Sequence, residues 1–201
     1  MKLFYSPLSP YVRKVMITAH ELGLADRIEK VEEGTTPLDP NPEVVAANPV
    51  GRIPAPVTED HGTLMDSRVI CRYLNSLGGG KLYGSGAEEW PIIAREALAE
   101  GIIDSALLAA YERRMRPEDM QFEPWVDGQK TKIRNGLSAV NARMGEWSGS
   151  GLTVDSIALG AALGYIDFRH GDLGWRDQNA ALADWYAGFA ERPSMQATAP
   201  A

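Results

Sequence analysis

The stretch that decides the fold is Asn-Pro-Val-Gly-Arg-Ile-Pro-Ala-Pro at residues 48–56, taken together with Asp66-Ser67 further along the chain. A proline cannot donate a hydrogen bond to a strand ladder, so Ile53-Pro54 is expected at the first residue of a strand or at a sheet edge. If this peptide bond is cis, the chain turns sharply there. The N–H and C=O of Ile53 would then face outward, where they could pair with an extended peptide as an added strand does.

Asp66-Ser67 stands where a helix is expected to begin. Ser67 is a favoured N-cap residue, and apolar residues follow it at helical spacing: Ile70, Tyr73, Leu74 and Leu77. A helix N-terminus carries N–H groups without helical partners and the positive end of the helix dipole, so it suits a carboxylate. The outward-facing N–H and C=O of Ile53, together with an anion site at this helix N-terminus, would suit the binding of a small acidic peptide.

Composition indicates an ordinary globular protein. The 201 residues are 44% hydrophobic and 23% charged, with a net charge of −7, which argues against nucleic acid or an anionic membrane as a main partner. The single cysteine, Cys71, excludes an internal disulfide and suits a reducing compartment. The chain shows no apolar signal segment and no run long enough to span a bilayer, so we expect a cytoplasmic protein.

The first part of the chain alternates strand and helix signals. Ser9 at an N-cap and Pro10 at the first helical position predict a helix that Gly23 ends. Asn41-Pro42 repeats this signature before a short helix through Ala47. The expected strands are residues 2–5, about 28–32, 53–58 and 63–65, and a helix is expected at 67–77. The resulting order, β-α-β-α-β-β-α, predicts an α/β unit on one mixed sheet.

Gly78-Gly79-Gly80 and the polar run after it end the strand signals. We therefore expect a first domain at residues 1–77, a linker at 78–87 and an all-helical domain at 88–201. Its helices are expected near 90–115, 122–147, 153–168 and 179–191. One buried face is predicted for Ile133, Leu137, Val140, Met144 and Trp147. Residues 157–164 are apolar nearly all round, which predicts a helix central to this domain.

These features resemble the glutathione S-transferase family. The resemblance rests on Lys-Leu-Phe-Tyr-Ser-Pro-Leu-Ser-Pro-Tyr-Val-Arg-Lys-Val at residues 2–15, on Pro-Val-Gly-Arg-Ile-Pro at 49–54, and on Ser67 after an acidic residue. It continues through Leu-Thr-Val-Asp-Ser-Ile-Ala at 152–158 and Arg-Pro-Ser at 192–194, and so covers essentially the whole chain. The chain is most similar to bacterial members with a serine in the first loop.

The resemblance implies a thioredoxin-like α/β N-terminal domain followed by an all-α C-terminal domain, which is the glutathione transferase fold. It implies glutathione as co-substrate, a small and mostly apolar electrophile, a homodimer and no metal. The helices near 67–77 and 90–115 are where a dimer surface is expected. The implied activity is addition or substitution at the glutathione sulfur, with a role in detoxification.

The resemblance also assigns roles to residues of the 48–56 stretch and to Asp66-Ser67. Ile53, with Pro54, would pair with the cysteinyl backbone of glutathione, and Asp66 and Ser67 would hold its γ-glutamyl end. Arg52 is expected near the glycine carboxylate, although a plain surface arginine is as reasonable an interpretation. Asp104 could reach the ligand of a partner subunit.

One well-placed hydroxyl at a helix start is energetically sufficient to activate the thiol. A free thiol has a pKa of about 8.5, and lowering it by about 2 units requires a preference for the anion of about 2.7 kcal/mol. A hydrogen bond to a charged group supplies about 1.5–3 kcal/mol, and a partly buried helix N-terminus up to about 2 kcal/mol. Ser9 occupies that place, although a plain N-cap is the simpler interpretation from spacing alone. Ser6 is the alternative and Tyr5 a third candidate.

The electrophile is expected between the domains, against Tyr11, Tyr111 and Met115. Two other functions stay open: a glutathione-binding interaction module with little catalysis, and a glutathione-dependent isomerase or lyase. A cysteine-type thiol-disulfide reductase is disfavoured because residue 9 is serine.

Other chemistries have little support in the sequence. The three histidines lack metal-ligand spacing, and no phosphate-binding loop or nucleophile elbow is found. Arg113, Arg114 and Arg116 end a helix, where cations favour the dipole, so no nucleic-acid patch is inferred. Cys71 lies inside a helical pattern and is expected to be a core thiol.

Overall fold

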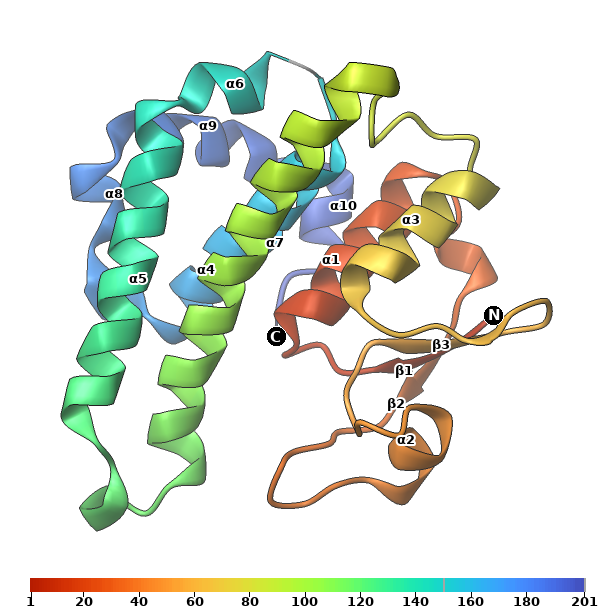
Figure 1. The fold of residues 1–201 in the computed structure, drawn as a ribbon, viewed down its shortest axis with the longest axis horizontal. Helices are drawn as coiled ribbons and strands as arrows, with labels where there is room; N and C mark the ends of the chain where they lie inside the picture. Colours follow the sequence, from red (N-terminus) through yellow and green to blue (C-terminus); the bar gives the residue numbers. More distant parts are fainter. Residues whose placement is uncertain (150, 201) are drawn as a thin grey trace. The chain divides into compact units, whose positions relative to one another are not determined.

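The structure, a computed structural model, describes residues 1–149 and 151–200. It divides into two compact units, one made of Met1–Leu82 with Pro193–Ala201 and the other of Tyr83–Arg192. The first unit is an α/β unit on a mixed sheet, and the second is helical (Figure 1). The expected fold class is therefore confirmed.

The sheet of the first unit has four strands in the order β2-β1-β3-β4. β1 runs parallel to β2 and antiparallel to β3, which is antiparallel to β4. The elements in chain order are β1 (Lys2–Tyr5), α1 (Pro10–Glu21), a 3₁₀ turn (Ala25–Arg27), β2 (Glu29–Glu32), α2 (Pro42–Ala47), β3 (Ala55–Thr58), β4 (Gly62–Thr63) and α3 (Ser67–Leu77). This is the order that the sequence predicts.

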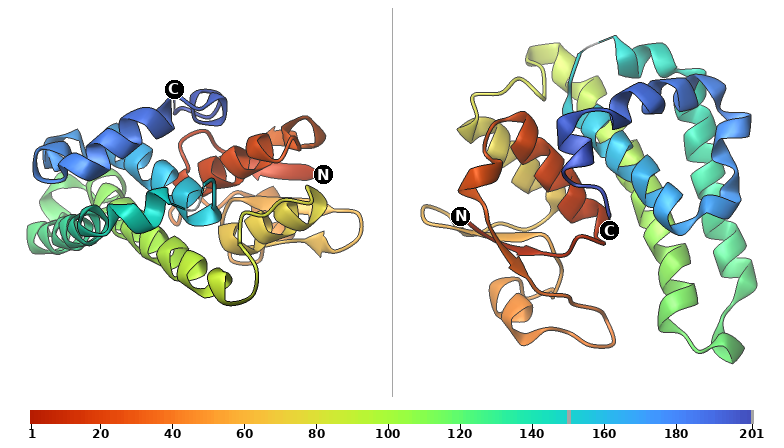
Figure 2. Two further views of the ribbon diagram at one scale, coloured as in Figure 1. Left: turned by 90° about the horizontal axis from the view of Figure 1, so that it is seen from above. Right: turned by 180° about the vertical axis from the view of Figure 1, so that it is seen from behind.

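Helices cover the sheet on both faces, as Figures 1 and 2 show. Successive side chains of a strand point to opposite faces, so the buried Leu3 and Phe4 serve different layers. Phe4 packs in a cluster with Val44 of α2 and Ala55 of β3. On the other face α1 packs against α3, where the Thr18 hydroxyl lies 3.3 Å from the Cys71 sulfur. Cys71 is fully buried, as expected of a core thiol.

The last residues of the chain pack with the first unit. α10 (Pro193–Gln196) contacts α1. There the Arg13 Nη2 donates to the carbonyl of Met195 at 3.2 Å, and the Ser194 hydroxyl donates to Glu21. The sequence-based division kept residues 88–201 together, whereas these contacts group Pro193–Ala201 with α1.

Several element boundaries differ from the sequence-based expectations, and three of them have a clear physical reason. β3 begins at Ala55 and not at Ile53, because Pro54 removes a ladder donor. The N-cap of α3 is Asp66 and not Ser67, since the Asp66 carboxylate accepts the N–H of Arg68 at 2.9 Å. The helix expected at 122–147 is two helices, because the N–H of Arg143 bonds back to Val140 and closes the first.

The second unit is built around one buried helix. α7 (Val154–Arg169) is buried at every position from Val154 to Ile166, which confirms the prediction of a central helix. It packs against α4 (Glu89–Met115), which also packs against α5 (Glu123–Ala142). A Cβ on Gly136 would lie 2.6 Å from Ile102, so glycine there lets α4 and α5 approach closely. The other elements are α6 (Met144–Ser148), α8 (Trp175–Gln178), α9 (Ala180–Ala190) and 3₁₀ turns at Gly86–Glu88, Glu118–Met120 and Gly171–Leu173.

A buried ion pair joins α4 to α7. The Arg95 Nε lies 2.6 Å from the Asp155 carboxylate, whose side chain is fully buried. We expect Arg95→Met to lower the free energy of unfolding by about 3–5 kcal/mol, because it leaves a buried carboxylate without its cation. Urea denaturation followed by circular dichroism measures the change.

The matched control is Arg143→Met, which removes the same charge from an exposed pair with Glu146 at 2.7 Å. Exposed pairs contribute little, so its denaturation midpoint should stay close to that of the parent. If Arg95→Met and Arg143→Met lost the same free energy of unfolding, the buried pair would contribute no more to stability than the exposed one.

Candidate functional site

Three segments meet at one end of the sheet of the first unit. In the β1–β3 pairing Phe4 is opposite Ala55, so continuing the register places Ser6 level with Ile53. In the β3–β4 pairing Val57 is opposite Thr63, and the bond from Leu64 N to Pro56 O extends it. The same register brings Asp66 level with Pro54. The loop after β1, the entry to β3 and the start of α3 are therefore neighbours.

The entry to β3 presents an unused backbone pair. The peptide bond between Ile53 and Pro54 is cis. Within residues 1–149 and 151–200, neither the N–H nor the C=O of Ile53 makes a hydrogen bond. The loop before it is tied down, since the Asn48 side-chain amide donates to the carbonyl of Arg52 at 2.8 Å. The Arg52 side chain itself is exposed.

The start of α3 combines backbone strain with charge. Asp66 has φ = 71°, a left-handed conformation that is uncommon outside glycine and often found at functional sites. Its carboxylate pairs with Arg68 at 2.8 Å. The hydrogen bond from Arg68 holds the pKa of Asp66 below its ordinary range, although partial burial opposes this. Ser67, the first residue of α3, is only 4% exposed.

The loop after β1 carries the hydroxyl groups proposed for a thiol. Ser9 is the N-cap of α1, and its Oγ accepts the N–H of Val12 at 3.3 Å. The Ser9 hydroxyl proton has no acceptor in the described part of the chain, so capping leaves it available as a donor. The Oγ of Ser6 accepts the N–H of Leu8 at 3.4 Å and does not lie at a helix terminus. Burial, then the Glu32 charge, raises the pKa of Tyr5.

The residues expected to contact an electrophile lie in both units. Tyr11 is on α1 and partly buried, whereas Tyr111 and Met115 lie four residues apart on α4 in the second unit, also partly buried. Asp104 is on the same helix and exposed.

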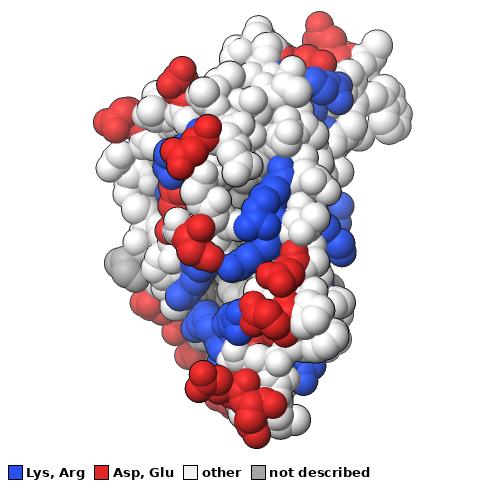
Figure 3. All heavy atoms as spheres, turned by 90° about the vertical axis from the view of Figure 1, so that its left-hand side faces the viewer, with Lys and Arg blue, Asp and Glu red and all other residues white. Residues whose placement is uncertain are grey.

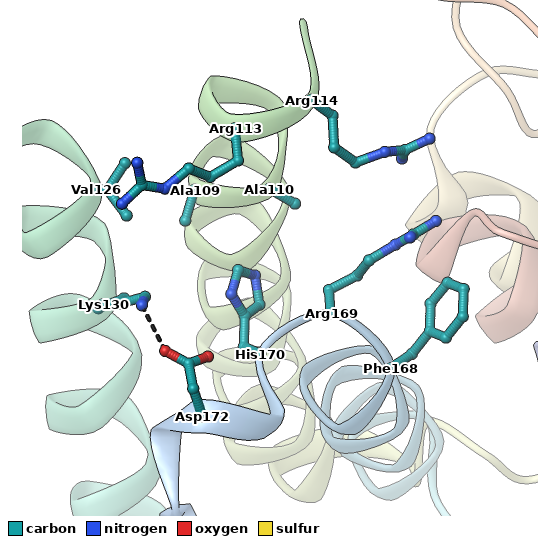
Figure 4. Close-up of a pocket in the computed structure, with 10 residues that line it drawn as sticks. All are labelled: Ala109, Ala110, Arg113, Arg114, Val126, Lys130, Phe168, Arg169, His170 and Asp172. Atoms are coloured by element: carbon teal, nitrogen blue, oxygen red, sulfur yellow. Dashed lines mark hydrogen bonds and ion pairs between the residues drawn. The ribbon is translucent and has the colours of Figure 1, made fainter. Parts of the chain in front are cut away.

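The second unit has a basic pocket that the sequence analysis missed. A cavity of about 480 Å³ lies where the ends of α4 and α7 meet α5 (Figure 4). From the sequence, the favourable interaction of cations with a helix C-terminus is enough to explain Arg113 and Arg114. A signal was nevertheless present in the sequence, because basic residues occur together again at Arg169-His170 at the end of α7.

Some of the positive charges in this pocket are neutralised. Arg113 pairs with Glu123, and Lys130 pairs with Asp172 at 2.7 Å. His170 is buried, and its Nε2 lies 2.8 Å from the carbonyl of Ala106. Burial lowers the pKa of His170, so the ring stays neutral at pH 7.

The described residues contain no group of three or more His, Cys, Asp and Glu side chains arranged to hold a metal ion. In the same residues, no helix combines the length and the apolar character needed to cross a membrane.

Comparisons with known proteins agree with this architecture. Residues 8–77 match the family described as "Glutathione S-transferase, N-terminal domain", and residues 123–188 match its C-terminal domain. An uncharacterised GST-like protein of Escherichia coli, YibF, is 30% identical over 100% of this chain and 98% of its own length.

Two solved structures are similar along the whole chain. A glutathione transferase family member from Pseudomonas fluorescens Pf-5, with bound glutathione, is 39% identical with a TM-score of 0.95, covering 100% of this chain and 98% of that one. A glutathione S-transferase from Methylobacillus flagellatus KT, also with glutathione bound, is 34% identical with a TM-score of 0.86, covering 100% and 99%.

The buried His170 predicts a pH dependence of stability. Its pKa is lower in the folded protein than the ordinary value of 6.5, so the unfolded chain takes up a proton first as pH falls. The free energy of unfolding should therefore decrease below about pH 6.5 and level off below the folded-state pKa. Urea denaturation between pH 7.5 and pH 5 measures this.

The control is His170→Gln, whose amide can still donate toward Ala106 but does not titrate in this range. In this variant the free energy of unfolding should change less steeply with pH between pH 7 and pH 5 than it does in the parent. An unchanged slope in His170→Gln would show that other groups carry the effect.

Proposed function

Because the chain belongs to the glutathione S-transferase family, we propose that it binds glutathione and transfers the thiolate to a small electrophile. The observation that carries this proposal is the backbone of Ile53 beside the start of α3, whose N–H and C=O make no hydrogen bond within the described residues. An extended peptide can pair with such a backbone segment as an added strand. The two similar structures that hold glutathione support the same ligand here.

We assign each part of glutathione to one part of this end of the sheet. The cysteinyl backbone pairs with the N–H and C=O of Ile53, held in place by Pro54. The γ-glutamyl carboxylate binds at the N-terminus of α3 through Ser67, where the helix dipole favours an anion. Arg52, which is exposed, takes the glycine carboxylate.

Asp66 receives the γ-glutamyl amino group in this proposal. Its carboxylate already pairs with Arg68, but both side chains are about half exposed. An exposed ion pair contributes only about 0–1 kcal/mol, so exchanging Arg68 for the ligand's ammonium group costs little. The left-handed backbone at Asp66 supports a binding role, since strain of this kind collects at ligand sites.

Ser9 stabilises the thiolate in the proposed reaction. Its proton is available, and its position at the N-cap of α1 adds the helix dipole. The thiolate sulfur forms a bond to an electrophilic carbon, and either a leaving group departs with its electron pair or a proton is taken up after addition. Tyr11, Tyr111 and Met115 are the candidate contacts for the electrophile.

The first test is an ultraviolet titration of the glutathione thiolate with saturating protein. We expect the bound thiol to have a pKa about 2 units below its free value of about 8.5. In Ser9→Ala it should return toward the free value, because the donor is lost. Ser9→Thr keeps both the hydroxyl and the N-cap and should restore the lowered pKa.

Ser6→Ala is the matched control and should leave the thiol pKa low. A shift that persists in Ser9→Ala and disappears in Ser6→Ala would transfer the role to Ser6. Binding of glutathione without any shift would contradict a transferase and favour a glutathione-binding module.

We also propose a cytoplasmic homodimer, in keeping with the family. Exposed apolar side chains occur on both helices expected at its surface. Val69 of α3 is 50% exposed, and Leu98 and Leu108 of α4 are 37% and 44% exposed. Single exposed apolar residues are ordinary, so the dimer has to be established by measuring the oligomeric state.

Val69→Glu would place a charge in a buried dimer interface. We expect sedimentation velocity to show a dimer for the parent and a larger monomer fraction for this variant. Lys81→Glu, a charge change at another exposed residue of the same unit, should not alter the distribution. A monomeric parent protein would contradict the homodimer.

A further inference from the structure

Lys14, in the second turn of α1, is a buried cation without a role in the reaction proposed above. Its exposed fraction is 0%, and lysine is seldom fully buried because removing an ammonium group from water is costly. Basic side chains more often lie at the surface, as on the face in Figure 3, where Lys and Arg occur beside Asp and Glu. Lys14 interacts with other groups of the chain, so its charge is held inside the protein in a defined place.

The helices α1 and α3 run side by side in the same direction. They pack against each other, as Figures 1 and 2 show. The Thr18 hydroxyl of α1 lies 3.3 Å from the Cys71 sulfur of α3. At the ends of both helices, a Cβ on Gly78 would lie 2.9 Å from the Cβ of Leu22. Because the contacts advance toward both C-termini together, the two N-termini lie at the same end.

This register places Lys14 at the start of α3. Lys14 lies one turn before Thr18, on the face of α1 that meets α3. One turn before Cys71 is Ser67, the first residue of α3, so Lys14 is level with Ser67. Long side chains in a helix point back toward its N-terminus. The ammonium group is therefore directed toward the end of the unit where the γ-glutamyl group is proposed to bind.

The electrostatics of Asp66 agree with this register. The hydrogen bond from Arg68 is the largest cause that lowers the pKa of Asp66, and the charge of Lys14 lowers it as well. Such an effect requires the two charges to be near each other. Helix packing and the charge effect thus both place Lys14 beside the residue that precedes α3.

The neighbouring cation serves a different part of the unit. Arg13 is also buried, and its Nη2 donates to the carbonyl of Met195 at 3.2 Å. Successive residues of a helix are about 100° apart around its axis, so Arg13 and Lys14 face different elements. Arg68 is about half exposed and pairs with Asp66. Of the two buried cations of α1, Lys14 is the one that faces the start of α3.

The charges at the start of α3 match those of a γ-glutamyl group, which carries one ammonium and one carboxylate group. Asp66 supplies the negative charge for the ammonium group. The N-terminus of α3 offers a carboxylate only about half an elementary charge, and Lys14 adds a whole one. Salt screens a buried charge much less than an exposed one, so the attraction of Lys14 for an anion is strong for its distance.

We propose that Lys14 is a positioning residue for glutathione. From the interface of α1 and α3 its charge holds the γ-glutamyl α-carboxylate at Ser67, so that the protein selects thiols in which this carboxylate is free. This inference rests on the proposed binding of glutathione, and it does not require the transfer reaction. No bond forms or breaks at Lys14.

The first experiment compares two ligands by isothermal titration calorimetry. One is glutathione, and the other is its analogue with a primary amide in place of the γ-glutamyl α-carboxylate, which keeps the ammonium group. The parent protein should bind the analogue at least about 10-fold more weakly, since a hydrogen bond to a charged group is lost. Lys14→Met should bind glutathione about 10-fold more weakly than the parent does, and the analogue no more weakly. A purely structural role of Lys14 would weaken both ligands alike, which would overturn the proposal.

Two variants serve as comparisons. Lys2→Met removes the same charge from an exposed residue at the end of β1 that is remote from the site, and it should discriminate between the ligands as the parent does. Arg68→Met removes the rival cation, which is exposed, and should also keep the discrimination. If Arg68→Met lost the discrimination and Lys14→Met kept it, the carboxylate would be held by Arg68 and the proposal would be wrong.

The second experiment needs no substitution at Lys14 and so does not depend on the folding of Lys14→Met. The affinities of the parent for both ligands are compared in about 0.05 M and about 0.5 M sodium chloride. Their ratio should change less than about 2-fold, because salt screens a buried charge weakly. A ratio that falls toward 1 at high salt would assign the discrimination to exposed cations and contradict the role of Lys14.

The outcomes separate Lys14 from the proposed function. A parent protein that does not bind glutathione would contradict the proposed function itself. Glutathione binding with equal discrimination in the parent and Lys14→Met would contradict the role of Lys14 alone. Discrimination that depends on Lys14, without a lowered pKa of the bound thiol, would contradict the transferase and support Lys14 as a positioning residue.

Discussion

The antiparallel pairing of β1 with β3 is the constraint on which the rest of the first unit depends. Its register brings the loop after β1 level with the entry to β3, and the β3–β4 pairing brings the start of α3 to the same end. A slip of one residue would turn every strand side chain to the opposite face. Phe4 would then leave its cluster with Val44 and Ala55, so packing of the core and alignment of the site are fixed together.

The described part of the second unit contains no sheet, so its helices are positioned by packing against one another. α7 is buried along most of its length and leaves little room for polar groups, so the charge of Asp155 is matched by Arg95 from α4. The ends of the helices are less constrained. There, among the residues that the structure describes, Arg113 and Lys130 pair with acids whereas Arg114 and Arg169 do not, so this end of the unit has a local positive charge.

Local chemistry explains which features could be predicted from the sequence. The starts of α1 and α2 follow from Ser9-Pro10 and Asn41-Pro42, whose caps act within three residues. The N-cap of α3 was assigned one residue late, because its left-handed backbone at Asp66 is rare and propensity favours serine there as much as aspartate. The contact between Arg13 and Met195 and the grouping of Arg114 with Arg169 join distant residues, and only packing reveals them.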